Sequence, residues 1–140
     1  MRFYSKKGII TGVILWGTVI FLIGSILFLP GGPEGKGETI IAVLVSGLTS
    51  AFISWIWFGT YYEINGSQLK VVGGPFRWKI DIMTITSIRK TRNPLSSPAL
   101  SLNRLEVQYG KWTTILISPK NKKQFCAELS KINSTIDLYL

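Results

Sequence analysis

The run GIITGVILWGTVIFLIGSILFL, residues 8–29, contains no charged residue and decides how the first part of the chain folds. An α-helix rises about 1.5 Å per residue, so a helix of this length crosses a hydrocarbon core of about 30 Å. A cleaved signal peptide has a shorter apolar core, of about 7 to 15 residues, that ends in small residues. Because this run is longer and ends in Phe28-Leu29-Pro30, we predict a retained transmembrane helix.

A second uncharged run, residues 40–62, follows a short polar connection and predicts a second helix. Aromatic residues gather at its far end, as they do at the interface between membrane and water. They are Trp55, Trp57, Phe58, Tyr61 and Tyr62. An antiparallel hairpin brings Phe3 and Tyr4 to the same interface, so we expect them in the same aromatic belt.

The basic residues that flank the two runs predict their orientation. Arg2, Lys6 and Lys7 precede the first run, whereas the connection carries one lysine, Lys36. Basic flanks mark the cytoplasmic side, and two spans return the chain to that side. We therefore expect a multi-pass protein of the cytoplasmic membrane with both termini in the cytoplasm, divided into a hairpin (1–62) and a cytoplasmic domain (63–140).

Small side chains recur every fourth residue along the second run, a pattern that lets two helices approach closely. They are Ala42, Ser46, Ser50 and Ser54, and the first run offers Gly8, Gly12 and Gly17. The stripe suits packing within one hairpin, which we favour, or self-association between two copies.

From residue 63 onward the apolar residues recur with a period of two, which indicates β-strands. Asn65-Gly66 is a strong hairpin signal between two such segments. A second turn at Gly73-Gly74 would set Val71 opposite Phe76 and Lys70 opposite Arg77, with the apolar pairs on one face and like charges on the other.

Six strands and one closing helix are predicted in this half of the chain. The strands are 61–64, 68–72, 76–82, 86–90, 104–109 and 112–117, and residues 93–101 form a connector rich in proline and serine. Ser118 is the expected helix cap and Pro119 the first helical residue, followed by an apolar stripe at Phe125, Leu129 and Ile132. The fold class is therefore α+β.

The segment YEINGSQLKVVGG, residues 62–74, and several later motifs carry a resemblance that covers residues 61–133. The later motifs are Ser97-Pro98-Ala99-Leu100-Ser101, Arg104-Leu105, Tyr109-Gly110 and Ile117-Ser118-Pro119. Their order resembles the small bacterial membrane proteins with a YyaB-like pleckstrin-homology (PH)-like domain. The resemblance implies a bent antiparallel sheet or partial barrel, closed by the C-terminal helix, with no enzymatic activity. Six strands are one fewer than a full barrel of this type has.

The composition argues against catalysis and against a metal or cofactor site. The chain has no histidine and one cysteine, Cys126, which removes the commonest general base and any intrachain disulfide. Glu63, Asp81 and Glu106 are scattered singly rather than paired in one motif. Cys126 lies in the predicted helix, where we expect it to be a small buried hydrophobe.

The net charge of +9 divides into +3 before the first run, −1 in the connection and +7 in the rest of the chain. Anionic lipids attract juxtamembrane basic groups, by about 1 kcal/mol for each group near the surface. An ordinary solvated surface explains the same charges equally well. The candidate contacts are Lys70, Arg77, Lys79, Arg89, Lys90, Arg92, Lys120, Lys122 and Lys123.

These features predict a non-enzymatic, membrane-anchored module that binds a protein partner or the anionic membrane surface. A structural or envelope-stress accessory protein that acts through association of its transmembrane helices is the alternative. Nucleic acid is disfavoured because Trp78 alternates inward and the domain is fixed to a membrane, although Trp112 could stack on bases if exposed. The sequence indicates no small-molecule substrate.

Overall fold

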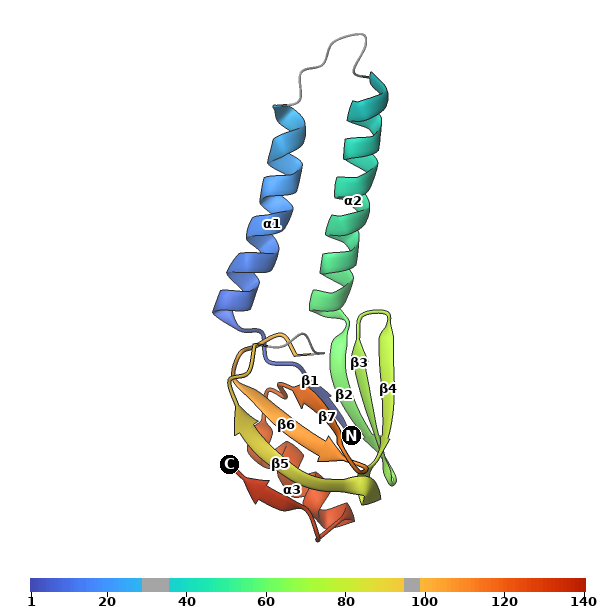
Figure 1. Cartoon of the computed structure of the whole chain (residues 1–140), viewed down its shortest axis with the longest axis vertical. Helices are drawn as coiled ribbons and strands as arrows, with labels where there is room; N and C mark the ends of the chain where they lie inside the picture. Colours follow the sequence, from blue (N-terminus) through green and yellow to red (C-terminus); the bar gives the residue numbers. More distant parts are fainter. Residues whose placement is uncertain (29–35, 95–98) are drawn as a thin grey trace.

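The computed structural model describes residues 1–28, 36–94 and 99–140, and shows two long helices standing on a β-rich domain (Figure 1). Helix α1 (Ile9–Leu27) and helix α2 (Lys36–Phe58) are antiparallel, and both are long and apolar enough to cross a membrane. Leu29 of the first predicted span, the polar connection up to residue 35, and Ser97-Pro98 of the predicted connector lie outside the described residues.

Helix α2 does not coincide with the predicted second span of residues 40–62. It ends at Phe58, and Gly59 separates it from strand β2 (Thr60–Asn65). Tyr62 lies on this strand with no exposed surface, and Phe3 is only 7% exposed. Neither belongs to the predicted aromatic belt, because both side chains point into the domain. Hydropathy could not place the boundary, since the uncharged run continues from the helix into the strand.

Two four-stranded sheets form the domain, and the strands of the second run across those of the first (Figure 1). The first sheet has the order β1-β2-β3-β4 and adds β1 (Arg2–Tyr4), β3 (Gln68–Gly73) and β4 (Phe76–Asp81) to β2. The second has the order β7-β6-β5-β8, with β5 (Ile85–Thr91), β6 (Arg104–Tyr109), β7 (Thr113–Ile117) and β8 (Asp137–Tyr139). A short 3₁₀ helix, η1 (Ile82–Thr84), joins the sheets, and helix α3 (Lys122–Ile132) precedes β8.

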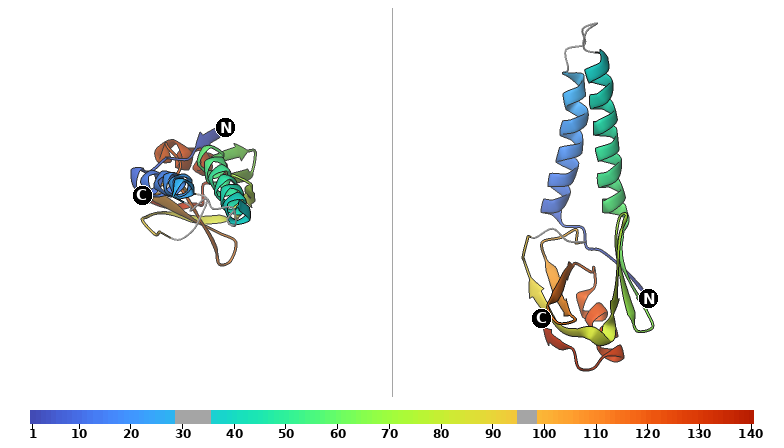
Figure 2. Two further views of the ribbon diagram at one scale, coloured as in Figure 1. Left: turned by 90° about the horizontal axis from the view of Figure 1, so that it is seen from above. Right: turned by 45° about the vertical axis from the view of Figure 1, so that its right-hand side comes forward.

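Strand β1, at the edge of the first sheet, links it to the end of β7 in the second sheet. It pairs with β2 on one side, and at its end Ser5 bridges Pro119, just after β7. The backbone N–H of Lys6 donates to the Ser118 carbonyl at 2.6 Å, and the N–H of Lys120 donates to the Tyr4 carbonyl at 3.0 Å. The hairpin of α1 and α2 is therefore inserted between two neighbouring strands of the domain (Figure 2).

All six predicted strands are present, as β2 to β7, but the structure adds two strands that the sequence did not predict. Strands β1 and β8 have three residues each, which is too short for a period of two to be recognised in the sequence. Strand β8 follows α3 and pairs in parallel with β5. The bent antiparallel sheet with a helix near the C-terminus, by contrast, is confirmed.

The β3–β4 turn lies at Gly74-Pro75 rather than at Gly73-Gly74. Lys70 therefore faces Lys79, and Val71 faces Trp78. Glycine at the first central position, with the φ of +59° that Gly74 has, is what a type II′ hairpin turn requires. Because the register differs from the predicted one by two residues, the apolar and the charged faces remain as predicted.

The hydrophobic core lies between the sheets and α3. The ring of Phe125 on α3 meets Phe3 edge to face, with centroids 5.3 Å apart, and lies 6.2 Å from the ring of Tyr62. Cys126 is buried in the same core, as predicted. Helix α3 is capped by Asn121, whose side chain accepts from the Gln124 N–H at 3.3 Å, so the predicted cap at Ser118 was wrong.

Candidate membrane-facing site

The segment between β1 and α1 holds the first helix against the domain. The Gly8 N–H donates to the Leu100 carbonyl at 2.9 Å, and the Thr11 hydroxyl donates to the same carbonyl. A Cβ atom on Gly8 would lie 3.0 Å from the Cα of Ser101, so the backbone approaches this loop closely. Helix α1 therefore leaves the domain in a direction that hydrogen bonds fix.

Three buried hydroxyl groups connect this segment to both sheets. The Tyr62 hydroxyl donates to the Ser5 Oγ at 3.2 Å and accepts from the Ser118 N–H at 3.0 Å, and the two serine Oγ atoms are 3.0 Å apart. Burial raises the pKa of Tyr62 above its ordinary value, so the phenol stays neutral and keeps its proton for this network. Ser118, which the sequence predicted as a helix cap, takes part in this hydrogen-bond network instead.

An aromatic cluster lies where the helices meet the domain. Trp16 contacts Trp57 and Phe58 edge to face, with ring centroids 6.5 and 6.3 Å away. The Nζ of Lys7 lies 4.4 Å from the Phe58 ring centroid, within the range of a cation–π contact. Trp16 is far along α1 in sequence, but helical side chains lean toward the N-terminus, which brings its ring down to this level.

Lys6 and Lys90 repel the charge of Lys122, the first residue of α3, and we call these three residues from separate elements the lysine cluster. The Nζ of Lys122 donates to the Asn103 Oδ1 at 2.5 Å. Burial, and then repulsion by Lys90 and Lys6, lowers the pKa of Lys122. Lys90 and Lys122 were among the predicted contacts, whereas Lys6 was recognised only as a flanking charge, because the tertiary fold brings it to the other two.

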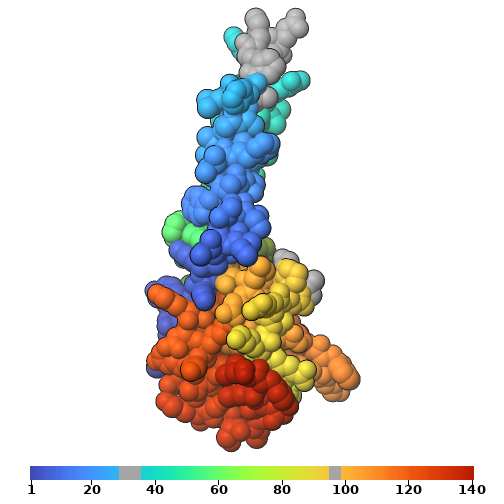
Figure 3. Space-filling view, turned by 90° about the vertical axis from the view of Figure 1, so that its left-hand side faces the viewer, coloured from blue at the N-terminus to red at the C-terminus, as the bar shows by residue number. Residues whose placement is uncertain are grey.

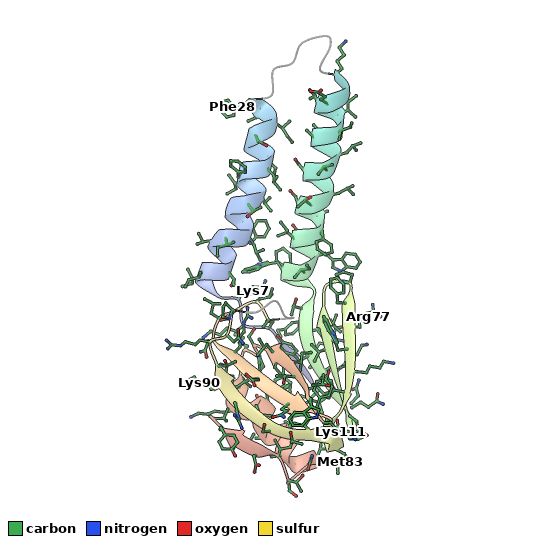
Figure 4. All side chains as sticks on the ribbon, in the orientation of Figure 1. Lys7, Phe28, Arg77, Met83, Lys90 and Lys111 are labelled. Atoms are coloured by element: carbon green, nitrogen blue, oxygen red, sulfur yellow. The ribbon has the colours of Figure 1, made fainter. Side chains whose placement is uncertain are left out.

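The remaining predicted contacts are dispersed over the domain. Lys70 lies between Glu63 and Lys79 in one row across the outer face of the first sheet, and Glu63 also meets Arg2 at 3.8 Å. Arg77 lies near the end of the domain from which the helices rise, opposite Lys111 and Met83 (Figure 4). Three further predicted contacts are exposed: Arg92, Lys120 and Lys123.

Arg89 points away from the lysine cluster, on the outer face of the second sheet. Its guanidinium lies 5.1 Å from the ring centroid of Tyr139 on β8, and Glu106 is its partner across the β5–β6 pair. These local partners account for its position.

The predicted helix-packing residues fall into two groups. Ser46 is buried and Ala42, Ser50 and Ser54 are half-buried, whereas most other residues of α2 are exposed. A Cβ atom on Gly12 would lie 3.1 Å from the Trp57 ring of α2, and Gly8 contacts the domain instead. Gly17 has no neighbour within 4 Å of an added Cβ atom and faces away. The placement of the serines supports packing within one hairpin.

Two observations bear on metal binding and on nucleophilic chemistry. Within residues 1–28, 36–94 and 99–140, no group of three or more metal-ligating side chains comes together. Burial raises the pKa of the Cys126 thiol to about 11, which makes it a poor nucleophile at neutral pH.

Trp112 and Trp78 differ in exposure. Trp112 is 90% exposed at the β6–β7 turn, which projects from the domain in Figure 3, whereas Trp78 packs against the core. The inward orientation predicted for Trp78 is therefore confirmed.

Comparison with known proteins identifies the β-rich part of the chain. A family model described as a bacterial PH domain matches residues 60–133, more than half of the chain. The match begins at Thr60, the first residue of β2, and ends at Asn133, the C-terminal cap of α3. No curated protein and no solved structure matches significantly.

Proposed function

The chain belongs to the bacterial PH domain family, and from that premise we propose a non-enzymatic binding module, anchored in the membrane, whose domain binds the anionic cytoplasmic leaflet. The lysine cluster carries this proposal. Its members come from the β1–α1 segment, β5 and α3, and repulsion by Lys90 and Lys6 lowers the pKa of Lys122. An anion above them would relieve that repulsion.

The geometry favours a lipid headgroup as this anion. The domain is joined to both helices without a flexible spacer, so its helix-proximal end lies beside the membrane whenever the helices span it. Charges within about 8 to 10 Å of an anionic surface are incompletely screened at physiological ionic strength. Since each such lysine contributes about 1 kcal/mol, the cluster can enrich anionic lipid several-fold around the protein.

The test uses the full chain reconstituted in bilayers that contain spin-labelled phosphatidylglycerol or phosphatidylcholine. We expect the protein to associate preferentially with the anionic lipid, and this preference to decrease in high salt. Lys90→Gln should reduce it, and Lys90→Gln combined with Lys122→Gln should reduce it further. Lys111→Gln removes one charge at the far end of the domain and should leave the preference unchanged.

Equal lipid preference in all variants would contradict the proposal. A second readout is the pKa of Lys122, followed by NMR of its side chain. A nearby anion favours the protonated form, so this pKa should be higher in phosphatidylglycerol than in phosphatidylcholine. The same pKa in both lipids would show that no headgroup lies over the cluster.

The proposal also includes the cytoplasmic position of both termini. The basic flank supports it, and α1 and α2 meet the domain at the same end (Figure 1). Protease added to intact cells should leave the domain uncut, and cleavage of the C-terminal part from outside would overturn this orientation.

A protein partner is a second candidate, which the exposure of Trp112 favours. This side chain projects at a turn next to η1, since the Gly110 N–H donates to the Thr84 carbonyl at 3.0 Å. The turn lies at the end of the domain away from the helices, beyond the reach of the leaflet. A photo-crosslinking residue at position 112 should give a defined adduct in cells if a partner binds there, and repeated absence of one would count against it.

A further inference from the structure

We propose that the tip of the β3–β4 hairpin, residues 74–76, inserts into the same membrane leaflet as the domain-side end of α2 and contacts lipid acyl chains there. This inference rests on the proposed membrane anchoring and adds a third membrane contact to the two helices. The hairpin reaches the level of the last turn of α2 (Figures 1 and 2).

The tip packs directly against α2. A Cβ atom on Gly74 would lie 2.9 Å from Cγ1 and 3.1 Å from Cα of Ile56, so only glycine permits this approach. The Gly74 N–H donates to the Gly59 carbonyl at 3.3 Å. The rings of Phe76 and Phe52 meet edge to face, with centroids 6.5 Å apart. These contacts hold the tip beside the helix and fix its depth relative to α2.

The depth of these contacts places the tip among lipid. Phe52 lies six residues before the end of α2 at Phe58, which corresponds to about 9 Å along the helix axis. If α2 spans the membrane, Phe52 lies inside the hydrocarbon region, beyond the domain-side end of the span. Phe76 touches Phe52 and must therefore reach into the same leaflet.

The exposed apolar surface is continuous from the helix to the hairpin. Phe76 is 53% exposed and Phe52 43% exposed, even though their rings touch. Pro75 is also exposed, and Trp55, one turn along α2 from Phe52, is exposed too. Since α2 is a candidate membrane span, lipid that covers this side of the helix also covers the hairpin tip.

The residues that follow the tip have the order expected at a membrane surface. Arg77 is exposed and lies on the opposite face of β4 from Phe76, where its guanidinium can reach the headgroups. Trp78 is half-buried, with its ring 6.1 Å from that of Phe76. An apolar tip, then a cation and a tryptophan, matches the change from hydrocarbon to interface.

Nitroxide labels can measure this depth in the full chain, reconstituted in phosphatidylglycerol–phosphatidylcholine vesicles. In a Cys126→Ala background, single cysteines are placed at Pro75→Cys, Phe52→Cys and Trp112→Cys. Oxygen concentrates in the acyl region and a charged nickel chelate in water, so their relative collision rates report depth. We expect the ratio at position 75 to resemble that at position 52 and to exceed that at position 112 several-fold.

The three sites distinguish the possible failures. A water-like ratio at position 75, together with a membrane-like ratio at position 52, would overturn the insertion of the hairpin but leave membrane anchoring intact. Water-like ratios at both positions would contradict the anchoring itself. Pro75→Cys leaves the Phe76 ring in place, so a negative result would not follow from loss of its contact with Phe52.

Discussion

Phe3→Ala tests whether the N-terminal residues belong to the β-domain, as the structure shows, or to the membrane interface, as the sequence suggested. The ring is 7% exposed and meets Phe125 edge to face at 5.3 Å. Truncation of a buried phenylalanine costs about 3 to 5 kcal/mol through lost burial and the cavity that remains. Strand β1 is short and can move to fill part of this cavity, so we expect a loss of about 3 kcal/mol, at the lower end of that range.

The measurement is urea unfolding of the full chain in detergent micelles, in which the near-ultraviolet circular dichroism follows tertiary structure. Small domains unfold with a slope of about 1 kcal/mol per molar urea. The expected loss of about 3 kcal/mol therefore moves the midpoint down by about 3 M. This loss is a large fraction of the free energy of unfolding of such a domain.

Tyr4→Ala is the matched control, because Tyr4 lies on the same strand but is 61% exposed. Its backbone carbonyl still accepts from the Lys120 N–H, so the strand pairing is preserved. We expect this variant to unfold within about 0.5 kcal/mol of the natural chain, as is usual for surface substitutions. Equal midpoints for Phe3→Ala and Tyr4→Ala would refute the placement of Phe3 in the core.

Three further predictions concern individual contacts. Burial raises the pKa of Cys126 to about 11, so its thiolate at pH 8 is about 100-fold scarcer than that of an ordinary cysteine; maleimide labelling should be slow until urea unfolds the domain. Asn133→Ala leaves the carbonyls of Ile82 and Ile85 without the amide that donates to them, which should cost about 2 kcal/mol in urea unfolding. Gly74→Ala should destabilise more than Gly66→Ala in the same assay, because both have positive φ but only Gly74 contacts α2.

The sequence predicted the elements that have a strong local pattern. Two long uncharged runs identified the helices, because length and apolar composition together decide whether a helix can span a membrane. Alternation over 76–82 and 104–109 identified β4 and β6, which the structure places at nearly the same residues. Asn65-Gly66 also marked the β2–β3 hairpin correctly.

Tertiary contacts decided what the sequence could not show. Nothing local distinguishes Phe3 in a core from Phe3 in a membrane interface, since both environments favour an aromatic ring. The lysine cluster was equally hidden, because its members lie in three elements that meet only in the folded domain. Phe76 was recognised as an inward strand residue, yet its position beside Phe52 depends on how the hairpin packs against α2.

The connection between the two long helices and the domain determines which fragment of the chain retains a complete core. The antiparallel strands β1 and β2 continue directly into the antiparallel helices α1 and α2, so the hairpin occupies the connection between two paired strands. A fragment of residues 63–140 would lack both Phe3 and Tyr62, whose rings contact Phe125 in the core. It would also lose the hydroxyl network of Tyr62, Ser5 and Ser118. The domain is thus completed by the residues that lead into α1 and out of α2.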